Sequence, residues 1–218
     1  MLKILVTFAL RQEGISFERR LTQRTAKSGL VLGRLDSQEV AICWLGVGVR
    51  QEVKFKRILS ELHFELVINS GFAGAVRTLL EPGDFVLAKN FSSPELSHRL
   101  ESNRVFEASG NFLSVDAVAD SATKARASSK GSFVALDMES ARVAAVCRHL
   151  AVPLVSARMI SDRSNEEIPG VFLGQGIRRL KDIPEAIAFA GRMIVLRRRL
   201  ADKLVELIRG LSQYSEGG

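Results

Sequence analysis

The sequence predicts an α/β sandwich, because short apolar runs typical of buried strands alternate along the chain with segments that carry a helical apolar stripe. The clearest example is residues 133–162, which fit a strand, a turn, a helix and a second strand. The apolar runs FVAL and PLVSARMI fit buried strands, and the helix between them ends before Pro153. We expect this unit to be a right-handed parallel crossover that places polar residues at the carboxyl ends of its strands.

The length and composition indicate a globular protein with a full hydrophobic core. The chain has 218 residues, 46% of them apolar and 25% charged, and we expect a single domain over residues 1–218. No apolar run approaches the ~20 residues of a membrane-spanning helix, and the apolar N-terminus lacks a cleavage site, so we expect a cytoplasmic protein without membrane contact. Cys43 and Cys147 lie in apolar surroundings, which favours buried thiols over a disulfide or a metal site.

The net charge of +7 raises the question of a nucleic-acid partner. The late arginines that contribute most visibly are Arg192, Arg197, Arg198 and Arg199. A run of this kind is more often the solvated face of a terminal helix, and we favour that interpretation. With one Trp and one Tyr the chain offers no base-stacking platform, so nucleic-acid binding is the weaker hypothesis.

The remaining elements follow from the same patterns, taken in chain order. Strands are expected at residues 2–9, 29–35, 40–45, 66–70, 85–88 and 112–115. Helices are expected at about residues 49–62, 95–100, 120–128 and 184–211. Loops are expected at residues 10–14, which lead into a basic amphipathic segment, at the small-residue run 71–74 and at residues 165–176.

Three acidic residues stand where predicted strands end: Glu13, Glu139 and Asp162. Carboxylates that share one cleft but differ in burial acquire different pKa values, and this arrangement suits acid–base chemistry. Each residue also has a structural explanation, since Asp162 could cap a turn, Glu139 could answer a helix dipole and Glu13 could be solvated. Spacing alone therefore leaves both interpretations open.

Other chemistries have little support in the sequence. The chain contains no HExxH or CxxC motif, and its three histidines form no pair at helical spacing, so we expect no metal site. The run Gly46-Val47-Gly48 lacks the third glycine of a dinucleotide fingerprint, and no GxxxxGK[ST] loop or GxSxG elbow occurs. We expect no cofactor.

Several stretches together resemble the purine nucleoside phosphorylase and nucleosidase superfamily, most closely its methylthioadenosine/S-adenosylhomocysteine nucleosidase-like branch. The stretches are VTFALRQE, WLGVGVRQE, VINSGFAGAV, EPGDFVLA, VALDMESARVAAVC and VPLVSARMISD, which occur in family order within residues 1–162. The resemblance implies a three-layer α/β/α sandwich with a central mixed sheet and a nucleoside bound at its carboxyl edge. It also implies cleavage of the N-glycosidic bond of a purine nucleoside, and a homo-oligomer, either a dimer or a hexamer.

The resemblance assigns expected roles to individual residues. Asp162 matches the aspartate that protonates or hydrogen-bonds the purine ring nitrogen, and Glu13 matches the glutamate that activates water. Glu139, with Met138 beside it, matches the residues that hold the ribose hydroxyls. The other positions that we expect to contact substrate are Ser161, Gly71, Phe72, Ala73, Val118 and Phe172, the last as part of a lid.

Departures from the family pattern bear on the nucleophile. Phe72 stands where the family commonly has Ser or Thr, and Asn69 rather than arginine precedes that loop, which favours hydrolysis. Arg11 and Arg50 could still bind phosphate, so phosphate-dependent cleavage with phosphate as co-substrate stays open. Val118 replaces an aromatic residue that stacks on the purine. A non-catalytic nucleoside-binding protein on the same scaffold is the alternative from another class.

Overall fold

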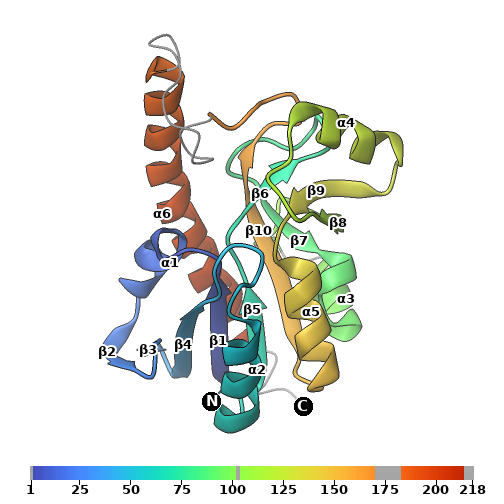
Figure 1. The fold of residues 1–218 in the computed structure, drawn as a ribbon. Coiled ribbons are helices and arrows are strands. Elements are labelled where there is room, and N and C mark those ends of the chain that lie inside the picture. Colours follow the sequence, from blue (N-terminus) through green and yellow to red (C-terminus); the bar gives the residue numbers. More distant parts are fainter. Residues whose placement is uncertain (1, 102–103, 170–182, 214–218) are drawn as a thin grey trace.

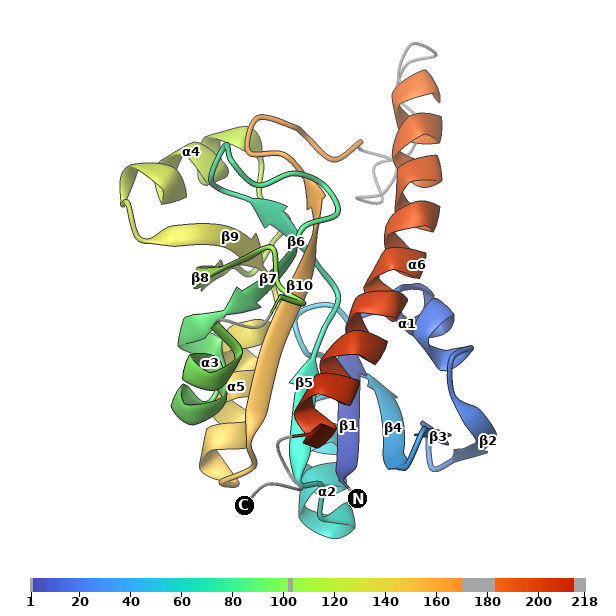
Figure 2. The same ribbon diagram turned by 180° about the vertical axis from the view of Figure 1, so that it is seen from behind.

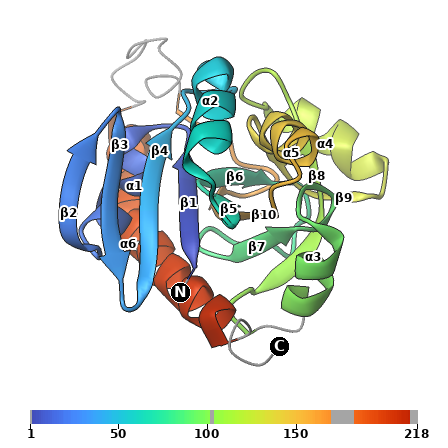
Figure 3. The same ribbon diagram turned by 90° about the horizontal axis from the view of Figure 1, so that it is seen from below.

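A computed structural model describes residues 2–101, 104–169 and 183–213 of the chain. A twisted mixed sheet lies between two groups of helices (Figure 1). Viewed from below, α2 and α5 cover one face of the sheet and α6 crosses the other (Figure 3). The predicted three-layer α/β/α sandwich is therefore confirmed.

Most elements agree with those expected from the sequence, but α1, β2 and β6 were not predicted. The strands are β1 (Lys3–Phe8), β2 (Thr22–Lys27), β3 (Leu30–Leu35), β4 (Gln38–Trp44), β5 (Leu66–Asn69), β6 (Phe72–Ala75), β7 (Phe85–Ala88), β8 (Ala108–Ser114), β9 (Phe133–Asp137) and β10 (Leu154–Asp162). The helices are α1 (Arg11–Glu18), α2 (Glu52–Leu62), α3 (Pro94–Glu101), α4 (Ser121–Ser129), α5 (Ser140–His149) and α6 (Ile183–Gln213), with a 3-10 turn η1 (Lys89–Phe91).

The sheet is organised around β10, which is shared by its two halves. The strand order is β2-β3-β4-β1-β5-β10-β6-β9-β8-β7. The first part of β10 pairs in parallel with β5, and its last part pairs in parallel with β6. A further antiparallel pairing of β10 with β7 closes the last five strands into a small barrel. Every residue of β10 is buried, and the strand pairs in turn with β5 over residues 154–156, with β7 over residues 157–159 and with β6 from Met159 onward.

The two faces of the sheet build two separate apolar cores, as strand alternation requires. On one face Ile4, Val6 and Phe8 of β1 belong to a cluster that includes the buried leucines of α6. On the other face Leu5 belongs to a cluster with residues of α2 and α5. The long helix α6 lies along the β1 face in the reverse view, where its N-terminal turns extend beyond the strands (Figure 2).

Three expectations about local structure are wrong. The segment at residues 71–74 is mostly strand β6 rather than loop, because it pairs with both β10 and β9. Residues 10–14 mostly form the start of α1 rather than a loop. The unit at residues 133–162 is not a parallel crossover: β9 runs antiparallel to β6, whereas β10 runs parallel to β6. The short strand β6 lies between β9 and β10 in the sheet, and because it is antiparallel to one and parallel to the other, β9 and β10 run in opposite directions.

Cys43 and Cys147 are buried and free, as expected, and burial raises the pKa of their thiols to about 11 and about 12. None of the helices in the described part of the chain combines the length and the apolar character needed to span a bilayer.

The packing of α6 predicts a large effect of one truncation. Leu204 is fully buried in the cluster between α6 and the sheet, so Leu204→Ala should lower the free energy of unfolding by about 2–5 kcal/mol in urea denaturation. Val195 on the same helix is 63% exposed, and Val195→Ala should change stability by about 0.5 kcal/mol or less. Equal effects of the two truncations would contradict the placement of α6.

Candidate active site

A cavity of about 470 Å³ lies where the segments after β1, β9 and β10 meet β6 and the first half of α6. A larger cavity of about 760 Å³ surrounds the opposite end of β10, near Pro153 and Leu154. The carboxylates that line the larger cavity, Glu65 and Glu95, are both exposed. We place the candidate site in the smaller cavity, because it gathers several buried charged groups.

Glu13, Glu139 and Asp162 all line this cavity. They come from α1, from the turn that precedes α5 and from the last residue of β10. Glu139 and Asp162 are buried, with exposures of 8% and 1%, whereas Glu13 is partly buried. Residues separated by up to 149 positions in sequence (162 − 13) therefore meet at one place, and their environments differ.

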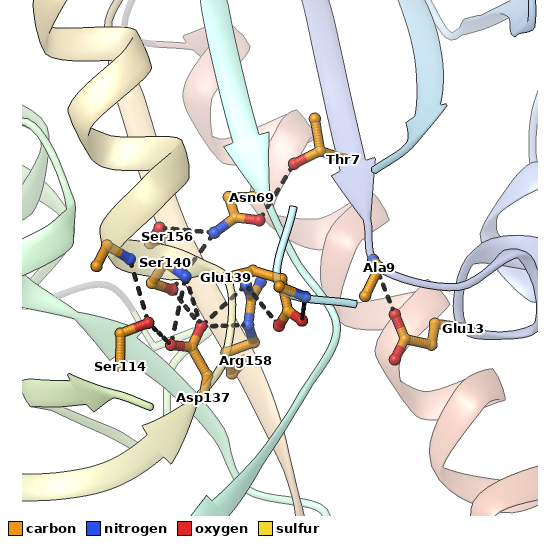
Figure 4. A network of polar contacts seen from close by, with 12 residues as sticks. Thr7, Ala9, Glu13, Asn69, Ser114, Asp137, Glu139, Ser140, Ser156 and Arg158 are labelled. Carbon is orange, nitrogen blue, oxygen red and sulfur yellow. Dashed lines mark hydrogen bonds and ion pairs between the residues drawn. The ribbon is translucent and has the colours of Figure 1, made fainter. Parts of the chain in front are cut away.

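A buried arginine organises the carboxylate side of the cavity (Figure 4). Arg158, in the middle of β10, is 1% exposed and donates from Nε to Asp137 Oδ2 at 3.0 Å. Its Nη2 also lies 3.0 Å from the same oxygen, as an ion pair without hydrogen-bonding alignment. The backbone N–H of Ser140 donates to Asp137 at 3.0 Å, and the Ser140 hydroxyl donates to it as well. Asp137 thus links the arginine to the first turn of α5.

The outer edge of the Arg158 guanidinium lies beside two further carboxylates. Nη2 is 3.9 Å from Glu139 Oε2. A Cβ atom at Gly71 would lie 3.2 Å from Glu13 Oε2 and 4.0 Å from Arg158 Nη1, so the glycine separates these two groups with little room to spare. Within the described part of the chain, Nη1 and Nη2 have no hydrogen-bond partner. Buried N–H groups without partners are costly, and here Nη2 lies close to Glu139, which lines the cavity.

Burial raises the pKa of both glutamates. Desolvation raises the pKa of Glu13 to about 7; hydrogen bonding to the Leu10 backbone opposes the rise and repulsion from Glu139 adds to it. The N–H groups of Ala9 and Leu10 both donate to Glu13 Oε2 at 3.1 Å. Desolvation also raises the pKa of Glu139, against the attraction of Arg158, and Gly48 N–H donates to its Oε1 at 3.0 Å. A carboxylate with a pKa near 7 is suited to accept a proton at neutral pH.

Asp162 has a different environment at the end of β10. Its Oδ2 accepts a hydrogen bond from the ammonium of Lys124, which is 1% exposed, and its Oδ1 accepts one from Ser161. The register of β10 against β6 shifts between Ile160 and Asp162, an irregularity of the kind that re-aims side chains near active sites. Asp162 is therefore an ion-paired carboxylate, unlike Glu13.

Most of the other expected substrate contacts lie at the same cavity. Its lining includes Met138, Ser161, Phe72, Ala73 and Val118. Gly71 adjoins it through its proximity to Glu13. Val118 is 45% exposed, so it belongs to the outer part of the lining.

The residues considered for phosphate binding lie elsewhere. Arg11 and Arg50 are exposed and do not line the cavity, and the Arg11 guanidinium lies 5.5 Å from the centre of the Trp44 ring. Phe172, the expected lid residue, lies outside the described residues. Within the described residues, no group of three or more His, Cys, Asp or Glu side chains could hold a metal ion.

The sequence patterns did not predict a role for Arg158, for Lys124 or for Asp137 as the partner of the arginine. Arg158 had a detectable signal, because a charged residue inside an otherwise buried strand needs a partner or a function. Lys124 had none: helix α4 has a polar composition in which a single inward lysine does not stand out. Lys124 lines the cavity and Arg158 lies beside Glu139 of its lining, and both are placed there only by long-range strand and helix packing.

Comparison with known proteins gives a consistent result. A curated 5'-methylthioadenosine/S-adenosylhomocysteine nucleosidase of Staphylococcus haemolyticus is 25% identical, over 71% of this chain and 83% of the relative. The solved S-adenosylhomocysteine nucleosidase of Streptococcus pyogenes, in complex with 5-methylthiotubericidin, has a TM-score of 0.74 at 19% identity and covers 96% of this chain and 97% of that chain. A Streptococcus pneumoniae 5'-methylthioadenosine/S-adenosylhomocysteine nucleosidase with the transition-state inhibitor MT-ImmA has a TM-score of 0.71 at 22% identity, covering 94% and 97%.

The family model is described as the phosphorylase superfamily and matches residues 9–132 and 93–187. These two matches include the segments that carry Glu13, Glu139, Arg158 and Asp162. The solved structures support the fold independently, since the similarity extends over nearly the whole chain. The resemblance inferred from the sequence is confirmed: the chain belongs to the phosphorylase superfamily.

Proposed function

We propose that this protein hydrolyses the N-glycosidic bond of a purine nucleoside in the cavity lined by Glu13, Glu139 and Asp162, with water as the nucleophile. The observation that carries the proposal is the buried Arg158, whose Nη1 and Nη2 atoms have no hydrogen-bond partner in the described structure and lie beside two carboxylates. Relatives named as nucleosidases support the substrate class, and two of their structures are complexes with 5-methylthiotubericidin and MT-ImmA.

Glu139 is the residue that we assign to the ribose. Its carboxylate is fixed by the Gly48 N–H and by the neighbouring Arg158, which leaves acceptor capacity for sugar hydroxyl groups. Met138 beside it contributes an apolar wall. A ribose held in this way presents its anomeric carbon between the carboxylates and the base.

Glu13 and Arg158 are the pair that we assign to the water. The arginine N–H groups orient the water oxygen, and Glu13 accepts a proton from the water as that oxygen bonds to the anomeric carbon. Positive charge on the sugar ring in the transition state is stabilised by the nearby carboxylates. A single acid–base contribution of this kind is worth about 10²–10⁴-fold in rate.

Asp162 is the residue that we assign to the purine. When the bond between the anomeric carbon and the base breaks, the electron pair stays on the purine, and a ring nitrogen becomes more basic. That nitrogen takes up a proton from solvent, and Asp162 accepts a hydrogen bond from the resulting N–H as the base leaves. The proton that Glu13 removed from the water returns to solvent. Asp162 and Glu13 both line the cavity, and the proposed reaction needs the nucleophile and the leaving group on opposite faces of the sugar.

Hydrolysis is favoured over phosphorolysis by the surroundings of the nucleophile. Phe72 brings an aromatic ring to the wall on which a phosphate would need hydrogen-bond donors. The side chain of Asn69 is engaged with Thr7, Ser140 and Ser156. Arg11 and Arg50 lie outside the cavity lining. A homo-oligomer and a cytoplasmic location remain predictions.

A nucleoside panel tests the proposal. The protein should release free base from at least one of methylthioadenosine, adenosine and inosine in phosphate-free buffer, as followed by chromatography. Arg158→Met should lower kcat/KM by about 10²-fold or more, because it removes the donors that orient the water. Binding of adenine without release of base from any nucleoside would instead support the non-catalytic alternative.

The raised pKa of Glu13 predicts a pH dependence. The proposed base must be ionised, so kcat/KM should fall as the pH drops below about 7, the pKa of Glu13 in the folded protein. Glu13→Gln should lower kcat/KM by about 10²–10⁴-fold and remove this acid limb. Glu61→Gln, at an exposed position of α2, is the control and should leave the profile unchanged. A wild-type profile that is flat between pH 5 and pH 7 would contradict the role of Glu13.

A further inference from the structure

Lys124 is the most deeply buried lysine among the described residues, and it lines the cavity beside Asp162. It is 1% exposed and comes from α4, whose other residues are mostly exposed or partly exposed. Its ammonium donates to Asp162 Oδ2, to the Arg163 carbonyl at 2.8 Å and to the Glu166 carbonyl at 2.7 Å. An ammonium group has three donors, so all of them are used.

The contact between Lys124 and Asp162 leaves little space for adjustment. A Cβ atom at Gly74 would lie 3.0 Å from Asp162 Oδ2 and 3.3 Å from Lys124 Cε. Both side chains of the ion pair are 1% exposed. Taking two charged groups out of water is costly unless they are paired and their remaining donors are satisfied. The lysine therefore has a definite position with respect to the carboxylate.

The same lysine ties down the turn after β10. Lys124 donates to two backbone carbonyls of this turn. Glu166, in the same turn, forms an ion pair with Arg192 of α6. Ser121 at the start of α4 donates to Glu167 at 3.1 Å. Asp162 is thus held by Lys124 of α4, and the turn that follows it is held by contacts from both α4 and α6.

We infer that Lys124 is a positioning residue for the cleavage: it holds Asp162 as an oriented carboxylate at the end of the cavity that receives the purine. The inference deepens the proposed function and depends on it for the identity of the ligand. Lys124 itself does not contact the substrate, because its three donors are already engaged. It acts through Asp162, whose Oδ1 is oriented by Ser161 and whose Oδ2 is oriented by the ammonium.

The chemical consequence concerns the leaving group. An oriented carboxylate accepts a hydrogen bond from a protonated ring nitrogen and stabilises the positive charge that the purine gains on protonation. That interaction is strongest when the glycosidic bond is breaking, so it acts mainly on kcat. The ribose contacts assigned to Glu139 do not involve the lysine and should survive its loss.

The test is Lys124→Met in the full-length protein, with kinetics on the best nucleoside of the panel. We expect kcat to fall by about 10²-fold or more and KM to rise by less than about tenfold. The affinity for adenine, measured by calorimetry, should fall by the same factor in Lys124→Met and in Asp162→Asn. Lys203→Met is the matched control: Lys203 is largely buried and pairs with Glu107 away from the cavity, so its loss should leave kcat, KM and adenine binding unchanged.

A double variant shows whether a loss of activity in Lys124→Met comes from misfolding or from the loss of the contact with Asp162. Lys124→Met/Asp162→Asn removes both charges and should be no less active than Asp162→Asn alone, within about twofold, because the lysine acts only through the aspartate. A further drop in the double variant, or a Lys124→Met protein that keeps kcat within about threefold, overturns the inference. These outcomes leave the proposed function standing. Absence of base release by the wild-type protein overturns the proposed function, while the comparison of adenine affinities still tests the positioning role.

Discussion

Buried charged groups surround the candidate active-site cavity. Asp137, Glu139, Arg158, Asp162 and Lys124 are all at most 8% exposed, and burying an isolated ion costs several kcal/mol even after relaxation. The chain meets this cost by matching Arg158 with Asp137 and Lys124 with Asp162. Among the described residues no cation lies at hydrogen-bond distance from Glu139 or Glu13, and burial raises the pKa of both. The cavity thus contains an ion-paired carboxylate, Asp162, and two carboxylates with a raised pKa, Glu13 and Glu139.

The position of β10 explains how this arrangement is kept rigid. The strand pairs with β5 in its first part and with β6 and β7 later, so it is held along its whole length. It carries Arg158 in its middle and Asp162 at its end. Glu139 is placed by the turn between β9 and α5, and Asp137 at the end of β9 ties that turn to Arg158. Hydrogen bonds of Asp137 therefore connect β9, the start of α5 and β10 around these polar groups.

Much of this could be predicted from the sequence, for reasons that particular residues make clear. Strands such as β1 and β10 and the helix α6 have strong apolar patterns, and the acids Glu13, Glu139 and Asp162 stand where strands end or soon after. Strand β6 could not be recognised, because its residues FAGA have little strand preference and it forms by pairing with β10 and β9. The direction of β9 depends on that same pairing. Lys124 and Arg158 could not be assigned partners, since Asp162 and Asp137 reach them only in the folded chain.

The central claim is that water, oriented beside Arg158 and Glu13, cleaves the bond between sugar and purine. The most direct measurement is the identity of the sugar product when the enzyme turns over a purine nucleoside in the presence of inorganic phosphate, followed by ³¹P NMR. The account predicts a free sugar, with the phosphate signal unchanged while the base accumulates. Formation of a sugar 1-phosphate in step with the base would contradict it.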